Sequence, residues 1–238
     1  MAKPSYIELP TGERMPILYE DRSVLAIDKP RGWILAPDFW SKTARNLQVA
    51  LAAGIAAREF WAQSRNLRFL RFVHRLDAET TGIVLLAKSK GAVGAYGRLF
   101  ESRQMEKRYI AVVKGAPQRE EWICRLRLSG DTDEHGRIVV DAEEGKEAET
   151  RFHVLKVGTG TSLIEARPVT GRTHQIRVHL AESGYPVVGD ELYGSKKTGK
   201  QLGLRAVALC YRDPFTNKRV GINAATTAFL REYGFDRI

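Results

Sequence analysis

The residues best suited to chemistry gather in one stretch, residues 72–88, whose sequence is FVHRLDAETTGIVLLAK. It carries an imidazole at His74, a guanidinium at Arg75 and a carboxylate at Asp77, and it then passes through a polar turn into the strand-like apolar run 83–87. A carboxylate can serve as a base or as a nucleophile. Asp and Gly are also common turn residues, so these residues alone leave open whether Asp77 is catalytic or only forms a turn.

The nine residues 74–82, HRLDAETTG, resemble the HRLDxxTSG signature of the RluA-type pseudouridine synthases, with Thr81 in place of the usual serine. Other segments resemble further motifs of that family and flank this one in the family's order. They are KPRG at 29–32, similar to KPxG; EKRYIAVVKG at 106–115, similar to EKRYxAxVxG; and GRTHQIRVHLAESGYPVVGDELYG at 171–194, similar to GRTHQIRVHLxxxGxPVxGDxLYG. By these motifs the chain is identified as a member of the family.

The resemblance implies that the chain isomerises uridine in structured RNA, ribosomal or transfer, to pseudouridine by breaking the N1–C1′ bond and rejoining the uracil through C5. Asp77 would act as a nucleophile at C1′ or as the base that removes a proton from C2′, and the sequence does not choose between them. Burial would raise the pKa of such a carboxyl, and a neighbouring cation would lower it again. By resemblance Arg177 is that cation, Tyr109 stacks under the uracil, and Ile176 forms a wall of the pocket.

A uridine stacked in RNA must be flipped out before its sugar is reached, at a cost of a few kcal/mol. By resemblance, Arg75 fills the gap that the flipped base leaves in the RNA. We expect four further contacts to substrate or RNA from side chains in the same motifs, namely His74, Thr81, Lys29 and Arg172. The reaction involves no net redox change, so we expect no cofactor. We also expect no metal, because the spacing of His174 and His179 puts them on one face of neither a helix nor a strand.

Besides Thr81, one segment and two single residues depart from the family. Residues 36–40, APDFW, stand where many members carry a His-Pro-Gly-like segment, so RNA contacts cannot be transferred there. Arg205 and Asp213 replace histidines of two C-terminal motifs, LHAxxL and FxHP. Many relatives also have an N-terminal S4 domain, and the early position of Asp77 leads us to expect the catalytic domain alone.

The resemblance implies an α+β fold, a largely antiparallel mixed sheet in two halves with flanking helices and a central basic cleft. We expect one catalytic domain over residues 1–238, with the resemblance strongest over 17–224. A chain of 238 residues, 43% of them hydrophobic, can bury one large core or two small ones.

Local patterns predict the elements. A turn at 20–23 joins two short strands into a hairpin, and apolar spacing over 42–63 predicts an amphipathic helix with Ser41 as its N-cap. Ser89 can cap a second helix over 90–103. Alternation predicts strands at 110–113, 122–128, 149–157 and 161–169, and the acidic stretch 131–147 reads as an exposed hairpin and loop facing away from RNA.

Charge favours a polyanionic partner. The formal net charge is +10, which points first to nucleic acid and secondly to a membrane surface. Four arginines interleaved with aromatic residues could track phosphates or could equally be a solvated face over a core; they are Arg58, Arg65, Arg68 and Arg71. No apolar run approaches 18 residues and no signal peptide is visible, so we expect a cytoplasmic protein. We also expect a monomer whose partner is RNA, with neither DNA nor a membrane as a partner. Cys124 and Cys210 indicate neither a disulfide framework nor a zinc ribbon.

Other classes of protein fit the sequence less well. A catalytically silent RNA-binding or ribosome-assembly factor would keep the basic surface, but it would be expected to lose Asp77, Tyr109 or Arg177, and all three are present. The segment 194–200 fits GxxxxGK, the start of a phosphate-binding loop, but Gln201 follows where that motif needs Ser or Thr. The glycines do not form the GxGxxG pattern of a dinucleotide-binding fold.

Overall fold

The computed structural model describes residues 2–35, 43–194 and 199–236, and the chain divides into two compact units. Unit 1 comprises residues 1–105 and 209–224, and unit 2 comprises residues 106–208 and 225–238. Strand β10, Leu204–Arg212, contributes its first residues to unit 2 and its last to unit 1. None of the helices in the described residues is long and apolar enough to cross a membrane.

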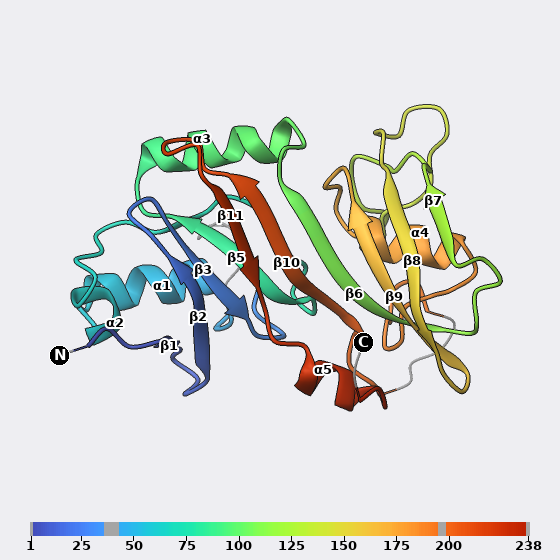
Figure 1. The fold of residues 1–238 in the computed structure, drawn as a ribbon, viewed down its shortest axis with the longest axis horizontal. Coiled ribbons are helices and arrows are strands. Elements are labelled where there is room, and N and C mark those ends of the chain that lie inside the picture. The colour runs from blue at the N-terminus through green and yellow to red at the C-terminus, as the bar shows by residue number, and fades with distance from the viewer. Residues whose placement is uncertain (1, 36–42, 195–198, 237–238) are drawn as a thin grey trace. The chain divides into compact units, whose positions relative to one another are not determined.

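Unit 1 is built on antiparallel strands in the order β1-β2-β3-β5, with β4 also paired to β5 and β11 paired to β10 (Figure 1). The strands are β1 (Tyr6–Glu8), β2 (Arg14–Glu20), β3 (Val24–Lys29), β4 (Arg71–Phe72), β5 (Thr81–Ala87) and β11 (Arg219–Asn223). The helices are α1 (Leu47–Ala56), α2 (Phe60–Gln63) and α3 (Lys90–Glu101). The predicted hairpin is confirmed as β2 and β3.

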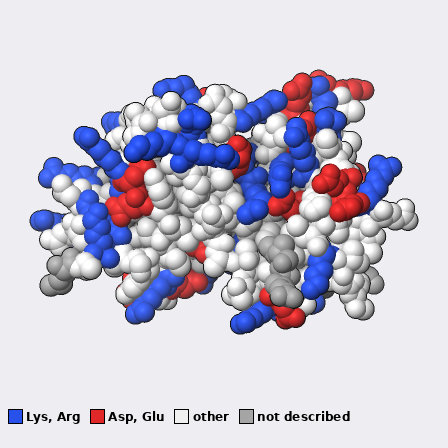
Figure 2. All heavy atoms as spheres, viewed as in Figure 1, with Lys and Arg blue, Asp and Glu red and all other residues white. Residues whose placement is uncertain are grey.

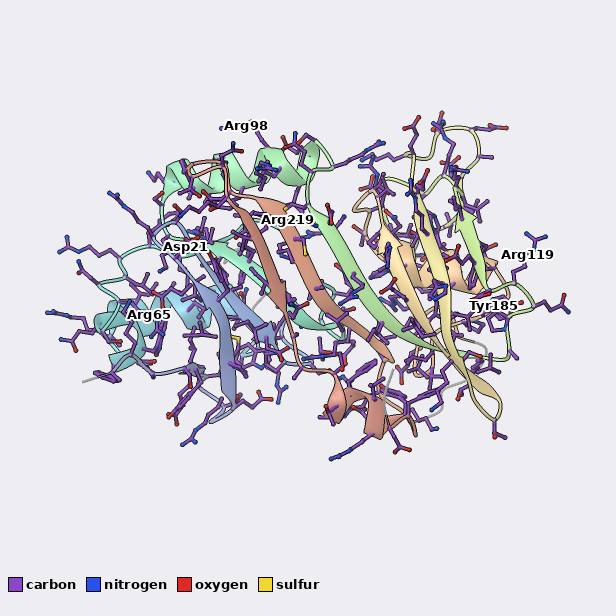
Figure 3. The ribbon with its side chains drawn as sticks, viewed as in Figure 1. Asp21, Arg65, Arg98, Arg119, Tyr185 and Arg219 are labelled. Carbon is purple, nitrogen blue, oxygen red and sulfur yellow. The ribbon has the colours of Figure 1, made fainter. Side chains whose placement is uncertain are left out.

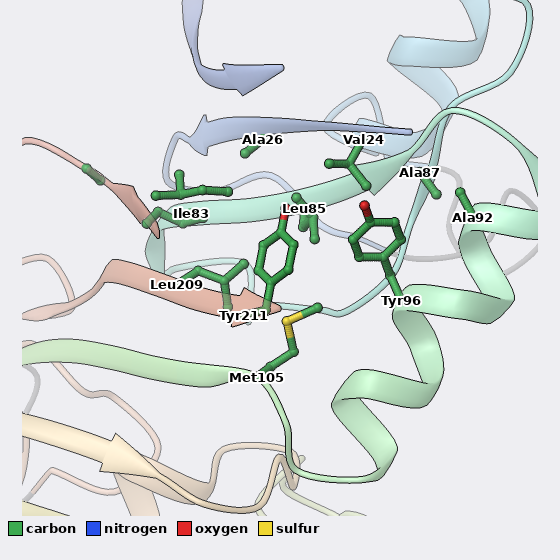
Figure 4. Packing of buried hydrophobic residues seen from close by; sticks show 12 residues of the cluster. Val24, Ala26, Ile83, Leu85, Ala87, Ala92, Tyr96, Met105, Leu209 and Tyr211 are labelled. Atoms are coloured by element: carbon green, nitrogen blue, oxygen red, sulfur yellow. The ribbon is translucent and has the colours of Figure 1, made fainter. Parts of the chain in front are cut away.

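The core of unit 1 lies between α3 and the sheet. Figure 4 shows Tyr96 of α3 near Tyr211 of β10, and Ala92 of α3 near Ala87 of β5, in a cluster of buried side chains. The predicted helix starts as expected, because the Ser89 side chain accepts the Ala92 N–H, and it ends at Glu101 rather than at residue 103. Ile83, Leu85 and Ala87 of β5 belong to this cluster, so the strand is packed along its length.

Unit 2 contains antiparallel strands in the order β6-β9-β8-β7. They are β6 (Glu106–Lys114), β7 (Glu121–Cys124), β8 (Thr150–Val157) and β9 (Thr161–Pro168), and the helices are α4 (Gln175–Glu182) and α5 (Thr227–Glu232). Side chains alternate along β6. Ala111 and Val113 pack with Ile176 and Leu180 of α4, whereas Ile110 and Val112 pack in a separate cluster with residues of α5.

Two predictions of local structure are wrong. The helix expected over 42–63 is broken into α1 and α2, because Arg58 takes a left-handed backbone conformation with φ of 55°. Asn46 caps α1 by accepting the N–H groups of the next turn, and Ser41 lies outside the described residues. The strand expected over 122–128 ends at Cys124.

The acidic stretch 131–147 is more firmly held than an exposed hairpin would be. It forms turns, and two isolated bridges join Leu128 to Val140 and to Lys146. Ile138 is 3% exposed and packs with Val178 of α4 in a small buried cluster. The stretch is therefore anchored on unit 2 beside α4, although most of its acidic side chains are exposed.

The fold class is confirmed as α+β, with mostly antiparallel strands and flanking helices. The cleft expected between two halves stays a prediction.

Candidate functional site

Asp77 occupies a tight turn that leads directly into β5. The turn closes through a bond from the Thr80 N–H to the Asp77 carbonyl, 3.1 Å long, and Gly82 follows with φ of 110°. Asp77 is partly buried. The antiparallel register pairs Lys29 at the end of β3 with Gly82 at the start of β5, so the predicted segments 29–32 and 74–82 lie next to each other.

Lys29 stabilises this turn through its side-chain ammonium. Its side chain is fully buried, and the ammonium donates to the carbonyls of Pro30, Trp33 and Ala78 at 2.9, 3.0 and 2.7 Å. Burial lowers the pKa of Lys29 to about 7, against the charges of Glu79 and Asp77, which raise it. The prediction that Lys29 contacts RNA does not fit this burial; the residue holds the turn that carries Asp77.

His74 is also tied to the protein. Its Nε2 accepts the Leu85 N–H at 3.0 Å, and its ring stacks on Phe100 of α3 with centroids 4.5 Å apart. Because Nε2 accepts, the ring proton lies on Nδ1 in the neutral form. The predicted RNA contact of His74 stays a prediction, while the observed contacts anchor the segment before Asp77 on β5.

Arg75 and Thr81 differ from these two residues. Arg75 is exposed, and no hydrogen bond or ion pair joins its side chain to another residue of the described part. Thr81 is partly buried as the first residue of β5. Unit 1 thus presents a carboxylate on a rigid turn, flanked by a guanidinium that projects into solvent.

In unit 2 the segment before α4 is held by Gln175. Its side-chain oxygen accepts from the Thr170 hydroxyl and the Arg172 N–H, and its NH2 group donates to the Glu149 carbonyl and the Thr150 hydroxyl, all within 2.7–3.0 Å. Four bonds from one buried amide satisfy its full capacity. The segment 170–175 is therefore rigid, and it delivers the chain into α4 through a left-handed His174 with φ of 52°.

Arg177 is buried on α4 and paired with Asp190. Its Nε and Nη2 donate to the two oxygens of Asp190 at 2.7 and 2.8 Å, and the Asp190 side chain is fully buried. Burial alone would raise the pKa of Asp190, but the bonds and charge of Arg177, with the N–H groups of Leu192 and Tyr193, hold it below the ordinary value. A two-point pair of this kind fixes the plane of the guanidinium.

Tyr193 closes the network around Arg177. The Arg177 guanidinium carbon lies 5.1 Å from the centre of the Tyr193 ring. The Tyr193 hydroxyl lies 2.8 Å from Nδ1 of His174 and accepts the Ile138 N–H at 2.7 Å. The acidic stretch therefore reaches the residues around α4 through Ile138, which the sequence pattern did not indicate.

Tyr109 and Ile176 belong to one hydrophobic cluster of unit 2, with Tyr109 partly buried at its margin. Ile176 is 7% exposed. Lys107, two residues before Tyr109 on β6, is largely buried and donates to the Thr170 carbonyl at 2.8 Å, and burial lowers its pKa to about 8. Arg172 is exposed and donates from Nε to the Glu147 carbonyl at 3.0 Å.

Unit 1 therefore holds Asp77, Arg75, His74, Lys29 and Thr81, and unit 2 holds Tyr109, Arg172, Ile176 and Arg177. The members of each set thus belong to the same compact unit. Pairing of Asp77 with Arg177 stays a prediction.

The sequence profile described as RNA pseudouridylate synthase matches residues 23–182. The chain belongs to this family. It is 36% identical over 219 residues to Ribosomal large subunit pseudouridine synthase C of Salmonella typhimurium and 35% identical over 219 residues to that of Escherichia coli, covering in each comparison 87% of this chain and 65% of the relative. The chain thus spans somewhat less than two thirds of the length of these relatives.

Solved structures of the family share the fold. Human RNA Pseudouridylate Synthase Domain Containing 1 matches with a TM-score of 0.68 and 26% identity, over 89% of this chain and 83% of that one. Human RNA Pseudouridylate Synthase Domain Containing 4 matches with a TM-score of 0.72 and 22% identity, over 91% of this chain and 92% of that one. The pseudouridine synthase fold is confirmed.

The two histidines absent from the C-terminal family motifs are replaced by structural side chains. Asp213 is buried; it accepts the Tyr96 hydroxyl and the N–H groups of Phe215 and Thr216. Arg205 is 8% exposed and donates to the Ala225 carbonyl at 3.0 Å. Asp213 therefore ties α3 to the turn after β10.

Metal-binding chemistry finds no support in the part of the chain that the structure describes, which holds no group of three or more suitable His, Cys, Asp or Glu ligands. His179 is fully buried between the Leu126 carbonyl and the Thr150 hydroxyl, and burial lowers its pKa. The departing segment 36–40 and most of the glycine-rich stretch 194–200 lie outside the described residues.

Sequence reasoning did not single out Asp190, Gln175 and Tyr193 as supports of the site. All three lie inside the long family motif over 171–194, which was the available signal. Their roles depend on which side chain each one meets, and the motif alone does not give that.

Proposed function

We propose that this chain is an RNA pseudouridine synthase, an isomerase that converts uridine in large-subunit ribosomal RNA to pseudouridine. The family match over residues 23–182 carries the proposal, and the bacterial relatives, which are named ribosomal large subunit pseudouridine synthases, suggest the class of RNA. The net charge of +10 suits a polyanionic substrate. The reaction requires no net oxidation or reduction, and we propose that the chain acts as a monomer without a cofactor.

Asp77 is the proposed catalytic residue. Its carboxylate would add to C1′ as the N1–C1′ bond breaks, or would take a proton from C2′ as that bond breaks, which leaves a glycal. In both routes the uracil then turns and C5 bonds to C1′, while the bond from Asp77 to C1′ breaks or the proton returns to C2′. The C5 proton is then lost and N1 gains one. The rigid support of the turn by Lys29 favours either role, because catalysis depends on holding the reacting group in place.

Arg177 is proposed to keep Asp77 ionised. A guanidinium is a planar group with five N–H donors, and Arg177 donates from Nε and Nη2 to Asp190. Asp190 fixes the orientation of the guanidinium, and this fixed orientation would let Arg177 act on the Asp77 carboxylate. A cation beside a carboxylate lowers the pKa of that carboxylate.

The uridine must leave its stack to reach Asp77. Tyr109, at the margin of its cluster, is proposed to stack under the flipped uracil, and Ile176 to form a wall of the pocket. Arg75, which is exposed, is proposed to fill the gap in the RNA. Thr81, His74 and Arg172 are proposed to contact RNA or substrate, and Lys29 to act only as a support.

The decisive experiment incubates unmodified large-subunit ribosomal RNA with the protein and, separately, with Asp77→Asn. Pseudouridine is mapped by carbodiimide treatment and primer extension. We expect new stops with the unchanged protein only, and RNA affinity that is similar for both. Turnover by Asp77→Asn would refute the catalytic assignment. Salt-sensitive binding without stops in either sample would favour a catalytically silent assembly factor.

A further inference from the structure

A polar pocket lies in unit 1 at the end of β5 that is farther from Asp77. It has a volume of about 550 Å³ and is lined by the β2–β3 turn, the connection between α2 and β4, and Lys88. Its cations are Lys3, Arg22, Arg65, Arg68 and Lys88. Figure 3 shows Arg65 and Asp21 on two of these segments, and Figure 2 shows Lys and Arg side chains gathered at the left of the view, where Figure 1 places α2.

Glu20 is the centre of an ion-pair cluster in this pocket. Glu20 accepts Nε of Arg65 at 2.8 Å and Nζ of Lys88 at 2.7 Å, and it is also 3.4 Å from Nζ of Lys3. The Arg65 side chain is 3% exposed and donates further to the carbonyls of Pro4 and Trp61. Arg65, one of the four arginines considered above, is therefore a structural residue with a fixed position.

Two further cations at the rim have no such restraint. Arg22 and Arg68 are exposed, and no hydrogen bond or ion pair joins either one to another residue of the described part. Arg22 sits on a turn stiffened by Asp21, whose carboxylate accepts the N–H groups of Ser23 and Val24. Both guanidiniums are thus available to an external anion.

The charge of the pocket is unbalanced. Five cations line it against two carboxylates, Glu20 and Asp21, which leaves an excess of three positive charges. Glu20 already serves three cations, and Asp21 is engaged with its own turn and with the Tyr19 hydroxyl. Guanidinium groups are well suited to phosphate oxygens, which they bind with two parallel N–H bonds.

The separation from Asp77 follows from β5. The seven steps from Thr81 to Lys88, at about 3.3 Å each, span roughly 23 Å. One strand of duplex DNA carries a phosphate about every 3.4 Å along its axis, and at that spacing roughly seven phosphates cover this distance. We propose that the pocket binds backbone phosphates of the RNA substrate several nucleotides away from the target uridine, as a second anchor that sets which RNA is held. The inference rests on the proposed function.

The test compares Arg22→Ala/Arg68→Ala with a control that removes the same charge from exposed residues of unit 2, Arg119→Ala/Lys156→Ala. Neither control residue has a hydrogen bond or ion pair to the described part of the chain. Affinity for in vitro transcribed, unmodified large-subunit ribosomal RNA is measured across a salt series, and pseudouridine formation is followed at saturating RNA. Thermal melting verifies that all variants are folded.

Loss of two phosphate contacts should make the plot of log association constant against log salt concentration less steep by about 1.4–1.8. This corresponds to a roughly 14- to 30-fold weaker affinity near 0.15 M salt. The rate at saturating RNA should not change, and the control should keep most of the slope. The deficit should disappear with RNA fragments too short to reach the pocket from the target uridine.

Equal slopes for the pocket variant and the control would overturn the proposal, as would a deficit that is independent of RNA length. Absence of pseudouridine with the unchanged protein would instead refute the proposed function. The binding comparison does not depend on turnover, so the two failures are distinguishable.

Discussion

Asp190→Asn removes the charge that balances Arg177 without changing the size of the side chain. Both carboxylate oxygens of Asp190 accept hydrogen bonds from Arg177, and the Asp190 side chain has no exposure to solvent. The Arg177 side chain is 8% exposed. Removing one partner of a buried pair leaves the other charge unbalanced, which costs about 3–5 kcal/mol. We therefore expect the free energy of unfolding to fall by about that amount at pH 7, as measured by urea-induced unfolding.

A matched control uses an exposed pair in the same unit. Glu149 accepts Nε of Arg125 at 2.8 Å and Nε of Arg151 at 3.2 Å, and both arginines are more than 60% exposed. Glu149→Gln should cost no more than about 1 kcal/mol, because exposed ion pairs contribute little. A loss in Asp190→Asn no greater than that of the control would refute the argument.

The pH dependence gives a second check of the same pair. The pKa of Asp190 is lowered in the folded state, so its contribution to stability is present above the unfolded pKa, near 3.9, and is lost as pH falls through the folded pKa. The difference between the unchanged protein and Asp190→Asn should therefore be full at pH 7 and should shrink below about pH 4. A constant difference across this range would show that Asp190 does not act through its charge.

Two further perturbations test the supports of the site. The pKa of Lys29 is lowered to about 7 in the folded protein, so between about pH 7 and 10 the unfolded chain binds more protons than the folded one. The free energy of unfolding, measured with urea, should therefore rise with pH across that range, and Lys29→Met should make the rise smaller. An unchanged rise would contradict the assignment. Gly189 has φ of 75°, and a Cβ there would lie 1.9 Å from the Gln201 carbonyl oxygen, so Gly189→Ala should destabilise by more than the roughly 1–3 kcal/mol of backbone strain alone. Gly184→Ala, with φ of 87° and open space around the Cβ, is the control for strain only, and equal melting temperatures for the two variants would contradict the clash.

Short-range features could be read from neighbouring residues. The Ser89 cap predicted α3, and the apolar run after Gly82 predicted β5, because both signals depend on residues close together in the chain. The helix expected over 42–63 failed at Arg58, since a left-handed residue other than glycine leaves little trace in apolar spacing.

The roles of the charged residues depended on partners distant in the chain. Lys29 bonds to the carbonyl of Ala78, 49 residues away, and Arg65 bonds to Glu20, 45 residues away. Residue type alone could not show that the first is a buried support and the second a member of an ion-pair cluster, because burial and pairing arise only when the strands assemble. Motif order was sufficient to place the chain in its family, since each motif is a continuous run of residues. Only the folded unit shows that Asp190 orients Arg177, because removing both charges from water costs free energy that their attraction and hydrogen bonds must offset.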